Sequence, residues 1–466
     1  MKKEKLKEQL NFNTQKLKNN KAITLIALVV TIVVLLILAG ISISLVVGDN
    51  GVIRKSKDAK KQYEEGQANE LAMTNEAGDL IDEQLAGPTP KVDVNTKAGE
   101  NGTINGKKGS STNPTIPKNY TPIDAGKATW GDGTSSPTQN AVDHGLVIKD
   151  DSGNEWVWIP VDSTTLGKMV ETSTEAKTLC GTSVTTNKYL KTITIGKDSN
   201  TATISRTTPG TTSDYREPDL LVGSDGTSYD AEDTNYKTIL GETGTKEQLA
   251  KLFVAEYNEM ITSISKYGGF YIGRYELSGT VTEPTEKSGE TLIKTDWYNL
   301  YNACRNSKLQ ASDKVKTQMI WGIQWDAACD FIANKGDQKN IKDSSTWGNY
   351  RNYNTANNYT EGTAGYEKNA GSKQDTGSSE NWKANNIYDL AGNCWEWTQE
   401  ALSTDSRAIR GGIFDCSGSG FPASYRNHSY PNSSSYGYNL RFSSHFNNKV
   451  TLNARAWAPV WRKIIK

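Results

Sequence analysis

Residues 22–47 form an unbroken stretch of 26 residues without a charged side chain. About 20 predominantly apolar residues are enough to cross the hydrocarbon core of a bilayer as an α-helix. The 21 residues before this stretch contain seven lysines and two glutamates. Because positively charged flanks stay in the cytoplasm, the sequence predicts a basic cytoplasmic leader at 1–21, a transmembrane helix at 22–47 and an extracellular remainder.

The beginning of this stretch, Lys21-Ala22-Ile23-Thr24-Leu25-Ile26, resembles a prepilin-type N-terminus. The resemblance implies cleavage between Ala22 and Ile23 by a prepilin peptidase and contact with type IV pilus-like machinery. Ala22 and Ala27 stand where that family usually has glycine and glutamate, and the glutamate is associated with assembly into a fibre. An ordinary uncleaved single-span anchor is the alternative.

The chain beyond the apolar stretch divides by composition. Residues 48–86 are charged and predict a helical stalk, whereas the Pro-, Gly- and Ser-rich residues 87–115 predict a flexible linker. Residues 116–446 predict one α+β domain with a Thr/Ser-rich insertion at 162–245, and a basic tail follows at 447–466. Its strand candidates are 145–149, 155–161, 189–195 and 269–277, and its helix candidates are 246–265 and 314–334.

Composition excludes several classes of protein. The chain has 53 basic and 53 acidic residues, so it lacks the positive excess of a nucleic-acid-binding protein. Its 12 Trp and 21 Tyr can fill a core and a binding surface despite a hydrophobic fraction of only 35%. Only three histidines are present, and the five cysteines form no CxxC pair. We interpret the cysteines mainly as small buried residues, with a disulfide or reactive thiol as the alternative.

Several segments of residues 116–446 together resemble the sulfatase-modifying-factor family, which includes the formylglycine-generating enzyme. They occur in that family's order, and the most specific is Asn386-Ile387-Tyr388-Asp389-Leu390-Ala391-Gly392-Asn393-Cys394-Trp395-Glu396-Trp397-Thr398. The other segments are 156–160 (WVWIP), 270–276 (FYIGRYE), 323–328 (IQWDAA), 409–412 (IRGG) and 440–441 (LR). The resemblance implies an irregular C-type-lectin-like fold.

The catalytic branch of that family holds copper with two cysteines after the Arg-Gly-Gly segment. Cys416 matches the first position and Phe421 occupies the second. Copper(I) requires soft thiolate ligands, and one thiolate cannot form the site. A sister branch holds iron with a histidine cluster that this chain lacks. We therefore expect no copper, no iron and no enzymatic activity, with a formylglycine-generating-type oxidase as the least favoured alternative.

The same resemblance implies a structural calcium site. In the resembling enzymes this segment binds calcium through two side chains and two backbone carbonyls. The matching groups are the carboxylates of Asp389 and Glu396 and the carbonyls of Gly392 and Cys394. Calcium prefers such oxygen ligands. Alternatively, the two carboxylates only cap a rigid turn. Trp395 and Trp397 are interpreted as core residues.

Residues 413–446 have the composition of a binding loop. Ser, Tyr, Gly and Asn supply 16 of the 26 residues from 413 to 438. Tyrosine offers amphipathic contact area at low entropic cost, and the small polar residues adapt their hydrogen bonds. We call residues 413–446 the predicted binding loop, and we expect its ligand to be an extracellular protein or a glycan.

Residues 401–448 contain no Lys, Glu, Gln, Met or Trp. Codons for these five end only in a purine, whereas every residue present can be encoded by a codon ending in C or T. Diversity-generating retroelements mutate adenines in AAC-type codons and leave this pattern. Their target proteins commonly carry the same fold, with the variable segment at the C-terminal end. A biased composition without hypermutation is the alternative.

The sequence thus predicts a non-catalytic adhesin or receptor on the cell surface, diversified in its C-terminal loop. A minor pilin-like structural subunit is the alternative. Expected ligand contacts are Phe414, Asp415, Ser417, Ser419, Phe421, Asn427, His428, Ser429, Tyr430, Ser433, Ser434 and Tyr436. Expected scaffold residues are Arg410, Gly411, Gly412, Pro422, Ala423, Arg426, Pro431 and Arg441.

Overall fold

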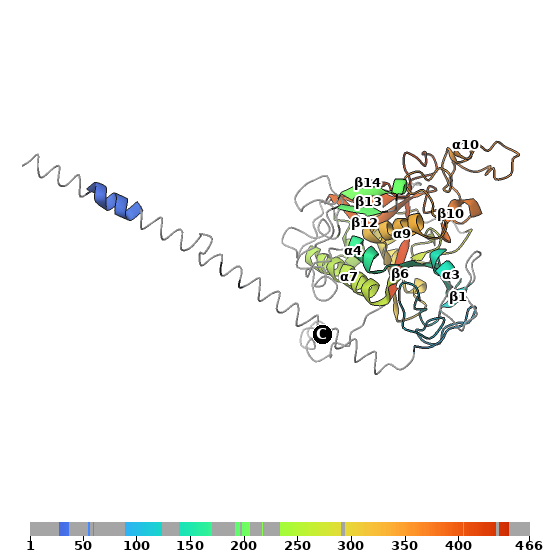
Figure 1. Ribbon diagram of the computed structural model, residues 1–466, viewed down its shortest axis with the longest axis horizontal. Coiled ribbons are helices and arrows are strands. Elements are labelled where there is room, and N and C mark those ends of the chain that lie inside the picture. The colour runs from blue at the N-terminus through green and yellow to red at the C-terminus, as the bar shows by residue number, and fades with distance from the viewer. Residues whose placement is uncertain are drawn as a thin grey trace, which may run out of the picture. The chain divides into compact units, whose positions relative to one another are not determined.

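The computed structural model describes residues 28–36, 55, 59, 89–123, 139–169, 192–195, 198–205, 217, 234–289, 294–403, 405–434 and 438–446. The chain divides into two compact units, Met1–Gly78 and Asp79–Lys466. We call the second unit the head (Figure 1). The predicted stalk, apart from residues 55 and 59, lies outside the described residues, as do the tail and Tyr436.

In the first unit, residues 28–36 of the predicted membrane helix are helical, and their side chains are exposed. None of the described helices combines the length and the apolar character that crossing a bilayer requires.

The head is built on a six-stranded antiparallel sheet in the order β1-β2-β3-β6-β16-β9. Its strands are Thr121–Ile123 (β1), Val147–Lys149 (β2), Glu155–Pro160 (β3), Gly269–Gly273 (β6), Val315–Met319 (β9) and Phe442–Phe446 (β16). The segments expected to be strands near 147, 155, 192 and 269 each contain one.

The two central strands β3 and β6 are apolar on both faces because both faces are covered. All five residues of β6 are buried, as are the four central residues of β3. Trp158 of β3 packs edge-on against Tyr271 of β6, with ring centroids 5.0 Å apart. Continuous apolar runs of this kind are typical of fully covered strands.

Two long helices pack on this sheet. Helix α7 (Lys246–Tyr267) contacts β6 and β16, and it begins with a capping box in which Thr245 and Gln248 satisfy each other's backbone N–H groups. It ends at Gly268, which has a φ of 74°. Helix α9 (Gly322–Asn334) contacts both β3 and β12 (Trp395–Ser403), and Figure 1 shows it next to β12.

The helix predicted over 314–334 is wrong in its first part. Residues 315–319 form β9, and the helix begins only at Gly322. Val315, Thr317 and Met319 alternate along the strand and are buried, but so is Gln318. The neighbouring strand β16 supplies the backbone partners for this segment. Pairing with residues more than 100 positions away overrides a helical spacing.

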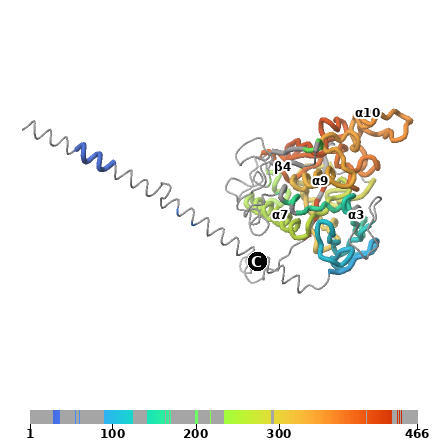
Figure 2. The backbone as a smooth tube through the Cα atoms, in the orientation of Figure 1, coloured from blue at the N-terminus to red at the C-terminus, as the bar shows by residue number. Residues whose placement is uncertain are grey.

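The prediction of a flexible linker over 87–115 is also wrong where the structure describes it. Residues 89–123 run along one end of the head in Figure 2. They bury Val92, Ala98, Ile104, Ile116 and Tyr120 in the main core. Asn113 donates to the Lys107 and Lys108 carbonyls, and isolated bridges join distant residues of the segment. A few apolar side chains and internal side-chain hydrogen bonds are enough to order a polar, glycine-rich segment.

A second sheet of four strands carries the candidate site. Its order is β14-β13-β12-β15, with β12 and β15 parallel and the other pairs antiparallel. The remaining strands are Ser406–Arg410 (β13), Arg426–Ser429 (β14) and Tyr438–Leu440 (β15). Smaller pairs are Thr192–Ile195 with Ala202–Ser205 (β4, β5), Ser278–Gly279 with Pro284–Thr285 (β7, β8) and Lys383–Ala384 with Ile387–Tyr388 (β10, β11).

Short helices complete the head: Gln139–Asp143 (α3), Ser163–Met169 (α4), Lys237–Leu240 (α6), Trp297–Cys304 (α8), Tyr353–Ala356 (α10), Asp198–Asn200 (η1), Ser307–Leu309 (η2) and Glu380–Trp382 (η3). The predicted insertion 162–245 contributes α4, β4, η1, β5 and α6, and α9 packs against α4 and β4. The architecture is α+β, as expected.

Candidate functional site

The residues expected to contact a ligand and those expected to form the scaffold differ in their exposure to solvent. Seven of the eight scaffold residues are buried, and the side chain of the eighth, Arg426, is only 6% exposed. None of the expected ligand contacts that the structure describes is buried. Asp415, Ser419, His428, Tyr430 and Ser434 are exposed, whereas Phe414, Ser417, Phe421, Asn427, Ser429 and Ser433 are half-buried.

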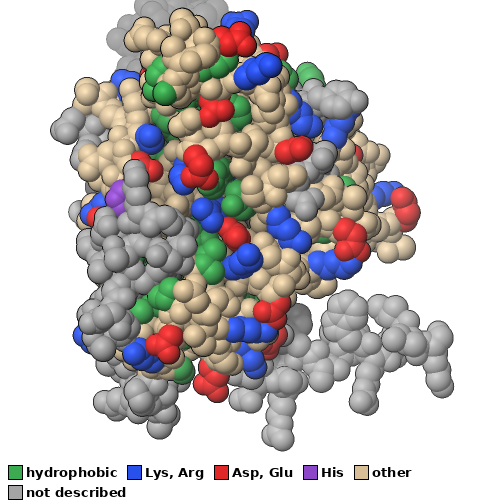
Figure 3. All heavy atoms as spheres, turned by 90° about the vertical axis from the view of Figure 1, so that its right-hand side faces the viewer, with side chains coloured by type: hydrophobic (Ala, Val, Ile, Leu, Met, Phe, Trp, Pro, Cys, Tyr) green, Lys and Arg blue, Asp and Glu red, His purple; other side chains and the backbone are tan. Residues whose placement is uncertain are grey.

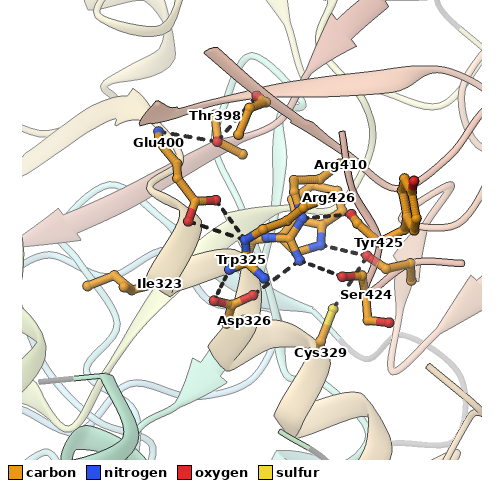
Figure 4. A network of polar contacts seen from close by, with 12 residues as sticks. Ile323, Trp325, Asp326, Cys329, Thr398, Glu400, Arg410, Ser424, Tyr425 and Arg426 are labelled. Carbon is orange, nitrogen blue, oxygen red and sulfur yellow. Dashed lines mark hydrogen bonds and ion pairs between the residues drawn. The ribbon is translucent and has the colours of Figure 1, made fainter. Parts of the chain in front are cut away.

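The loop is held by a network of charged side chains, shown in Figure 4, which we call the anchor network. It consists of Asp326 on α9, Glu400 on β12, Arg410 on β13 and Arg426 on β14. Asp326 accepts from both arginines, at 3.1 Å from Arg410 Nη2 and through a second, short contact from Arg426 Nη2. Arg426 Nε also lies 3.2 and 3.0 Å from the two oxygens of Glu400. Two carboxylates therefore pair with two guanidinium groups, and the buried Glu217 lies beside Gly322 together with Glu400.

The anchor network also holds backbone. Arg410 donates to the carbonyls of Tyr425 and Ser424, at 2.9 and 3.1 Å. Its guanidinium lies over the Trp325 ring, 5.4 Å from the centroid. Burial and the nearby Arg426 lower the pKa of Arg410, while Asp326 and Glu400 raise it. Strand β14, which carries the expected contacts Asn427, His428 and Ser429, thus has a rigid base.

The two glycines of the Arg-Gly-Gly segment have φ values of 86° and 83°, a region that favours glycine. A Cβ on Gly412 would lie 2.3 Å from the Phe421 carbonyl oxygen. The buried Tyr350 hydroxyl lies 2.6 Å from the Gly411 carbonyl and 2.8 Å from the Phe421 carbonyl. This close approach folds residues 413–421 back onto the head.

Three aromatic rings form a small cluster next to this fold. Trp395 is 7% exposed and packs against Phe421 and Tyr425, with centroids 5.7 and 6.2 Å apart. The Phe421 and Tyr425 centroids are 5.0 Å apart. Trp395 and Trp397 are core residues, as expected. Tyr425, which is 38% exposed, was not expected as a contact.

The residues expected to bind calcium lie in a second group of buried charges. Here Glu276, Glu286, Asp389 and Glu396 lie near a single guanidinium, that of Arg441, and we call these four carboxylates the acidic cluster. Arg441 pairs with both Glu396 oxygens, at 3.2 and 3.0 Å, and donates to the Gly273 and Tyr275 carbonyls. The four carboxylates outnumber this cation.

The carboxylates of the acidic cluster differ in the hydrogen bonds that they accept. Asp389 Oδ2 accepts from the Thr376 hydroxyl and the Gly377 N–H, at 3.1 and 2.8 Å. Glu276 accepts from the Asn393 amide and the Cys394 N–H. Neither oxygen of the buried Glu286 receives a hydrogen bond of good geometry from the described residues. Its carboxylate packs against Gly273, where a Cβ would approach it to 2.3 Å.

Burial is the largest cause of raised pKa values in this cluster. It raises the pKa of Asp389 to about 6 and that of Glu396 to about 7, although Arg441 opposes both shifts. Burial and the neighbouring carboxylates raise the pKa of Glu276 and Glu286 well above the usual range.

Some features of the acidic cluster favour calcium binding, and others oppose it. The excess of negative charge and the unsatisfied Glu286 favour a cation, whereas Arg441 already holds both oxygens of Glu396. Among the described residues no three or more His, Cys, Asp or Glu side chains are grouped so as to hold a metal ion.

The cysteines and histidines are dispersed over the head. Cys304, Cys329 and Cys394 are buried, as expected, and Cys416 is partly buried. Cys180 lies outside the described residues. His428 on β14 has its Nδ1 2.9 Å from the Ser406 hydroxyl, whereas His144 pairs with Asp337 at 3.3 Å.

The sequence reasoning missed four acidic residues that matter here: Asp326, Glu400, Glu276 and Glu286. All four are buried, and Asp326 and Glu276 stand in the otherwise largely apolar segments 323–328 and 270–276. An acidic residue in such a segment indicates a buried partner, because an isolated buried charge is strongly unfavourable. Glu217 from the insertion is another example, since it accepts from the Ile323 N–H at the start of α9.

Figure 3 shows one face of the head on which acidic, basic and hydrophobic side chains are interspersed. No protein-family model matches the chain, and no curated protein sequence does either. Among solved structures, similar chains include Treponema denticola variable protein 1, at 15% identity and a TM-score of 0.19, covering 28% of this chain and 47% of that one. This chain therefore spans about half the length of that protein.

A second similar structure is PvdO from Pseudomonas aeruginosa, at 11% identity and a TM-score of 0.29. The match covers 64% of this chain and 97% of that one. Both TM-scores are too low to establish a shared fold, so the functional interpretation rests on this chain's own residues.

Proposed function

We propose that this chain is a non-catalytic ligand-binding protein, an adhesin or receptor, displayed on the cell surface by its N-terminal apolar segment. The head provides a rigid scaffold of C-type-lectin-like type, and the predicted binding loop recognises an extracellular protein or glycan. A diversity-generating retroelement diversifies the loop. Binding is direct contact by exposed side chains on a fixed backbone, and no chemical step is involved.

One observation supports this proposal most strongly: the expected contacts and the expected scaffold have opposite exposure. The loop presents small polar and tyrosine side chains outward, while the scaffold residues Arg410, Gly411, Gly412, Pro422, Pro431 and Arg441 are buried. Buried arginine pairs and close-packed glycines hold the backbone independently of the outward side chains. Such a loop tolerates replacement of its contacts without losing its shape, which is what diversification requires.

The codon hypothesis has a direct test in the source population. We would deep-sequence the codons for residues 400–450 across one population, with codons 316–366 of the same gene as the matched control. Substitutions should concentrate at the expected contact positions, mostly in codons ending in C or T. Codons 410–412 and the control window should stay constant. Equal variation in the two windows would contradict diversification.

An invariant loop would leave a receptor of fixed specificity or the alternative, a minor pilin-like subunit. These are separated by isolating surface fibres from cells that express the chain. A pilin-like subunit should co-purify with the fibres, and variants in the predicted binding loop should not change that. A receptor should instead bind a protein or glycan from an array, and loop variants should abolish the binding.

A further inference from the structure

Strand β14 is an edge strand of the four-stranded sheet. It pairs with β13 on one side, and no described strand pairs with it on the other. Four expected contacts, Asn427 to Tyr430, lie on it or directly after it. An edge strand presents backbone N–H and C=O groups that can pair with another chain.

The hydrogen bonds show which groups of β14 point outward. His428 lies opposite Ala408 of β13, and the Ala408 carbonyl accepts from the Thr398 hydroxyl of β12, at 3.4 Å. That carbonyl therefore points toward β12. Residues of an antiparallel pair alternate between bonded and non-bonded positions. The pair Ala408 and His428 is therefore non-bonded, so the N–H and C=O of His428 point to the outer edge.

The outward N–H of His428 is covered by the side chain beside it. Asn427 Oδ1 accepts from this N–H at 2.9 Å. The bond is local and lies at the surface, so a competing carbonyl can replace it at small free-energy cost. Natural edge strands are commonly protected from unwanted pairing by their own side chains or by charge. Asn427 gives β14 such protection, and it is itself an expected variable position.

Two exposed aromatic side chains flank the same edge. The structure describes three large apolar or aromatic side chains on the head that are exposed: Tyr359, Tyr425 and Tyr430. Tyr425 directly precedes β14 and Tyr430 directly follows it, and their exposed fractions are 38% and 63%. Tyrosines are enriched among the residues that dominate binding energy at protein interfaces.

The geometry points to an extended segment of a partner polypeptide as the occupant of this edge. The segment adds to β14 as a fifth strand, its carbonyl takes the His428 N–H from Asn427, and its side chains contact Tyr425 and Tyr430. This inference rests on the proposed function and identifies the ligand as a protein. Backbone pairing supplies affinity, and the alternating side chains supply specificity. Asn427 is a positioning residue whose replacement opens the edge.

The test is selection of a random 12-residue peptide library on the full-length chain in detergent, followed by affinity measurement on two variants. His428→Pro removes the outward backbone donor together with the imidazole, and proline is tolerated on an edge strand where its missing N–H faces away from the ladder. His428→Ala removes the imidazole and its contact with Ser406 but keeps the N–H. The selected peptides should bind wild type and His428→Ala alike and lose about tenfold or more on His428→Pro.

Three outcomes would overturn the inference. A loss on His428→Ala equal to that on His428→Pro would mean that the imidazole, not the backbone, is recognised. Self-association of wild type that His428→Pro abolishes would make a second copy the occupant. A selection that enriches no peptide would reject a polypeptide segment, and a positive glycan array would then leave the proposed function intact while ending this inference.

Amide hydrogen exchange checks the geometry without any ligand. In Asn427→Ala, exchange at the His428 amide should become a few-fold faster, since one surface hydrogen bond is lost. Exchange at the Asn427 and Ser429 positions, which face β13, should not change. Faster exchange at all three positions would show that the strand itself had loosened, and no change at His428 would show that Asn427 does not protect the edge.

Discussion

The head contains two buried groups of charges that satisfy their electrostatics in opposite ways. In the anchor network, two carboxylates face two guanidinium groups at hydrogen-bond distance. In the acidic cluster, four carboxylates lie near the guanidinium of Arg441, and Glu286 receives no hydrogen bond of good geometry from the part of the chain that the structure describes. In the first group each guanidinium has a carboxylate partner from the chain itself, whereas the second group requires protons or a cation.

This difference in charge pairing predicts how the stability of each group responds to pH and to ions. A balanced, hydrogen-bonded group holds its shape over a wide pH range, which suits the base of a binding loop. An unbalanced buried group couples folding to pH or to a bound ion, because charges in a low-dielectric interior are unfavourable without partners. The scaffold is therefore expected to respond to solution conditions at the acidic cluster and not beneath the loop.

The largest effect is expected from Asp326→Ala. It leaves Arg410 and Arg426 without their shared partner inside the protein, and breaking a buried pair in this way costs about 3–5 kcal/mol. The measurement is the free energy of unfolding in denaturant. The matched control is Glu283→Ala, which breaks the exposed pair with Lys308 and should cost less than about 1 kcal/mol. Equal effects would show that the anchor network is not stabilising.

Calcium should act on the acidic cluster alone. If Asp389 and Glu396 hold the ion as predicted, calcium at about 100 times its dissociation constant stabilises the fold by about 3 kcal/mol. Asp389→Asn should weaken that response, whereas Glu400→Gln in the anchor network should not. Thermal unfolding with excess calcium and with a chelator measures the difference. Identical curves would mean that Arg441 and protons are the only neutralising groups.

Glu286→Gln should change how stability depends on pH. The folded-state pKa values of the acidic cluster are raised, so the folded protein binds more protons than the unfolded chain between pH about 4 and pH about 7. Stability should therefore fall as the pH rises through this window. Removing the Glu286 charge should raise stability at pH 8 and change it little at pH 4, in the absence of added metal.

Urea unfolding at pH 4, 6 and 8 checks this prediction. Asp415→Asn is the matched control, because Asp415 is exposed in the binding loop and should leave the pH profile unchanged. A profile for Glu286→Gln that parallels wild type would show that Glu286 does not contribute to the excess charge.

The smallest effect is expected from Tyr430→Ser. Tyr430 is exposed and projects from a backbone that other residues hold, so the free energy of unfolding should change by no more than about 0.5 kcal/mol. The same substitution at Tyr350, whose buried hydroxyl contacts two loop carbonyls, should cost several times more. Thermal unfolding compares the two. A large loss at Tyr430 would contradict the separation of contacts from scaffold.

Much of the local structure could be predicted from the sequence. The apolar runs at 155–160 and 269–273 are strands, the segment 246–267 is a helix with a capping box, and Trp395 and Trp397 are buried. Gly411 and Gly412, which were expected to be scaffold residues, are buried and have positive φ, a region that favours glycine. These features depend on near neighbours in the chain.

The two incorrect predictions, a linker at residues 89–115 and a helix at residues 315–319, have a common cause. The sequence of residues 89–115 predicts a linker because it contains few apolar residues. Those residues nevertheless pack into the main core. Residues 315–319 have helical spacing, yet they pair with β16, which lies far along the chain. In both cases, contacts between distant residues overrode a weak local preference.

The sequence by itself determined which side chains avoid water, where glycine is required and what chemistry the binding loop offers. Only the tertiary structure decided how the charges pair, because Asp326 and Arg426 are 100 residues apart and Glu396 and Arg441 are 45 apart. It also decided which strand stays at an edge. Solvent preference and backbone propensity are properties of single residues and near neighbours, whereas charge pairing and strand order depend on where distant segments meet.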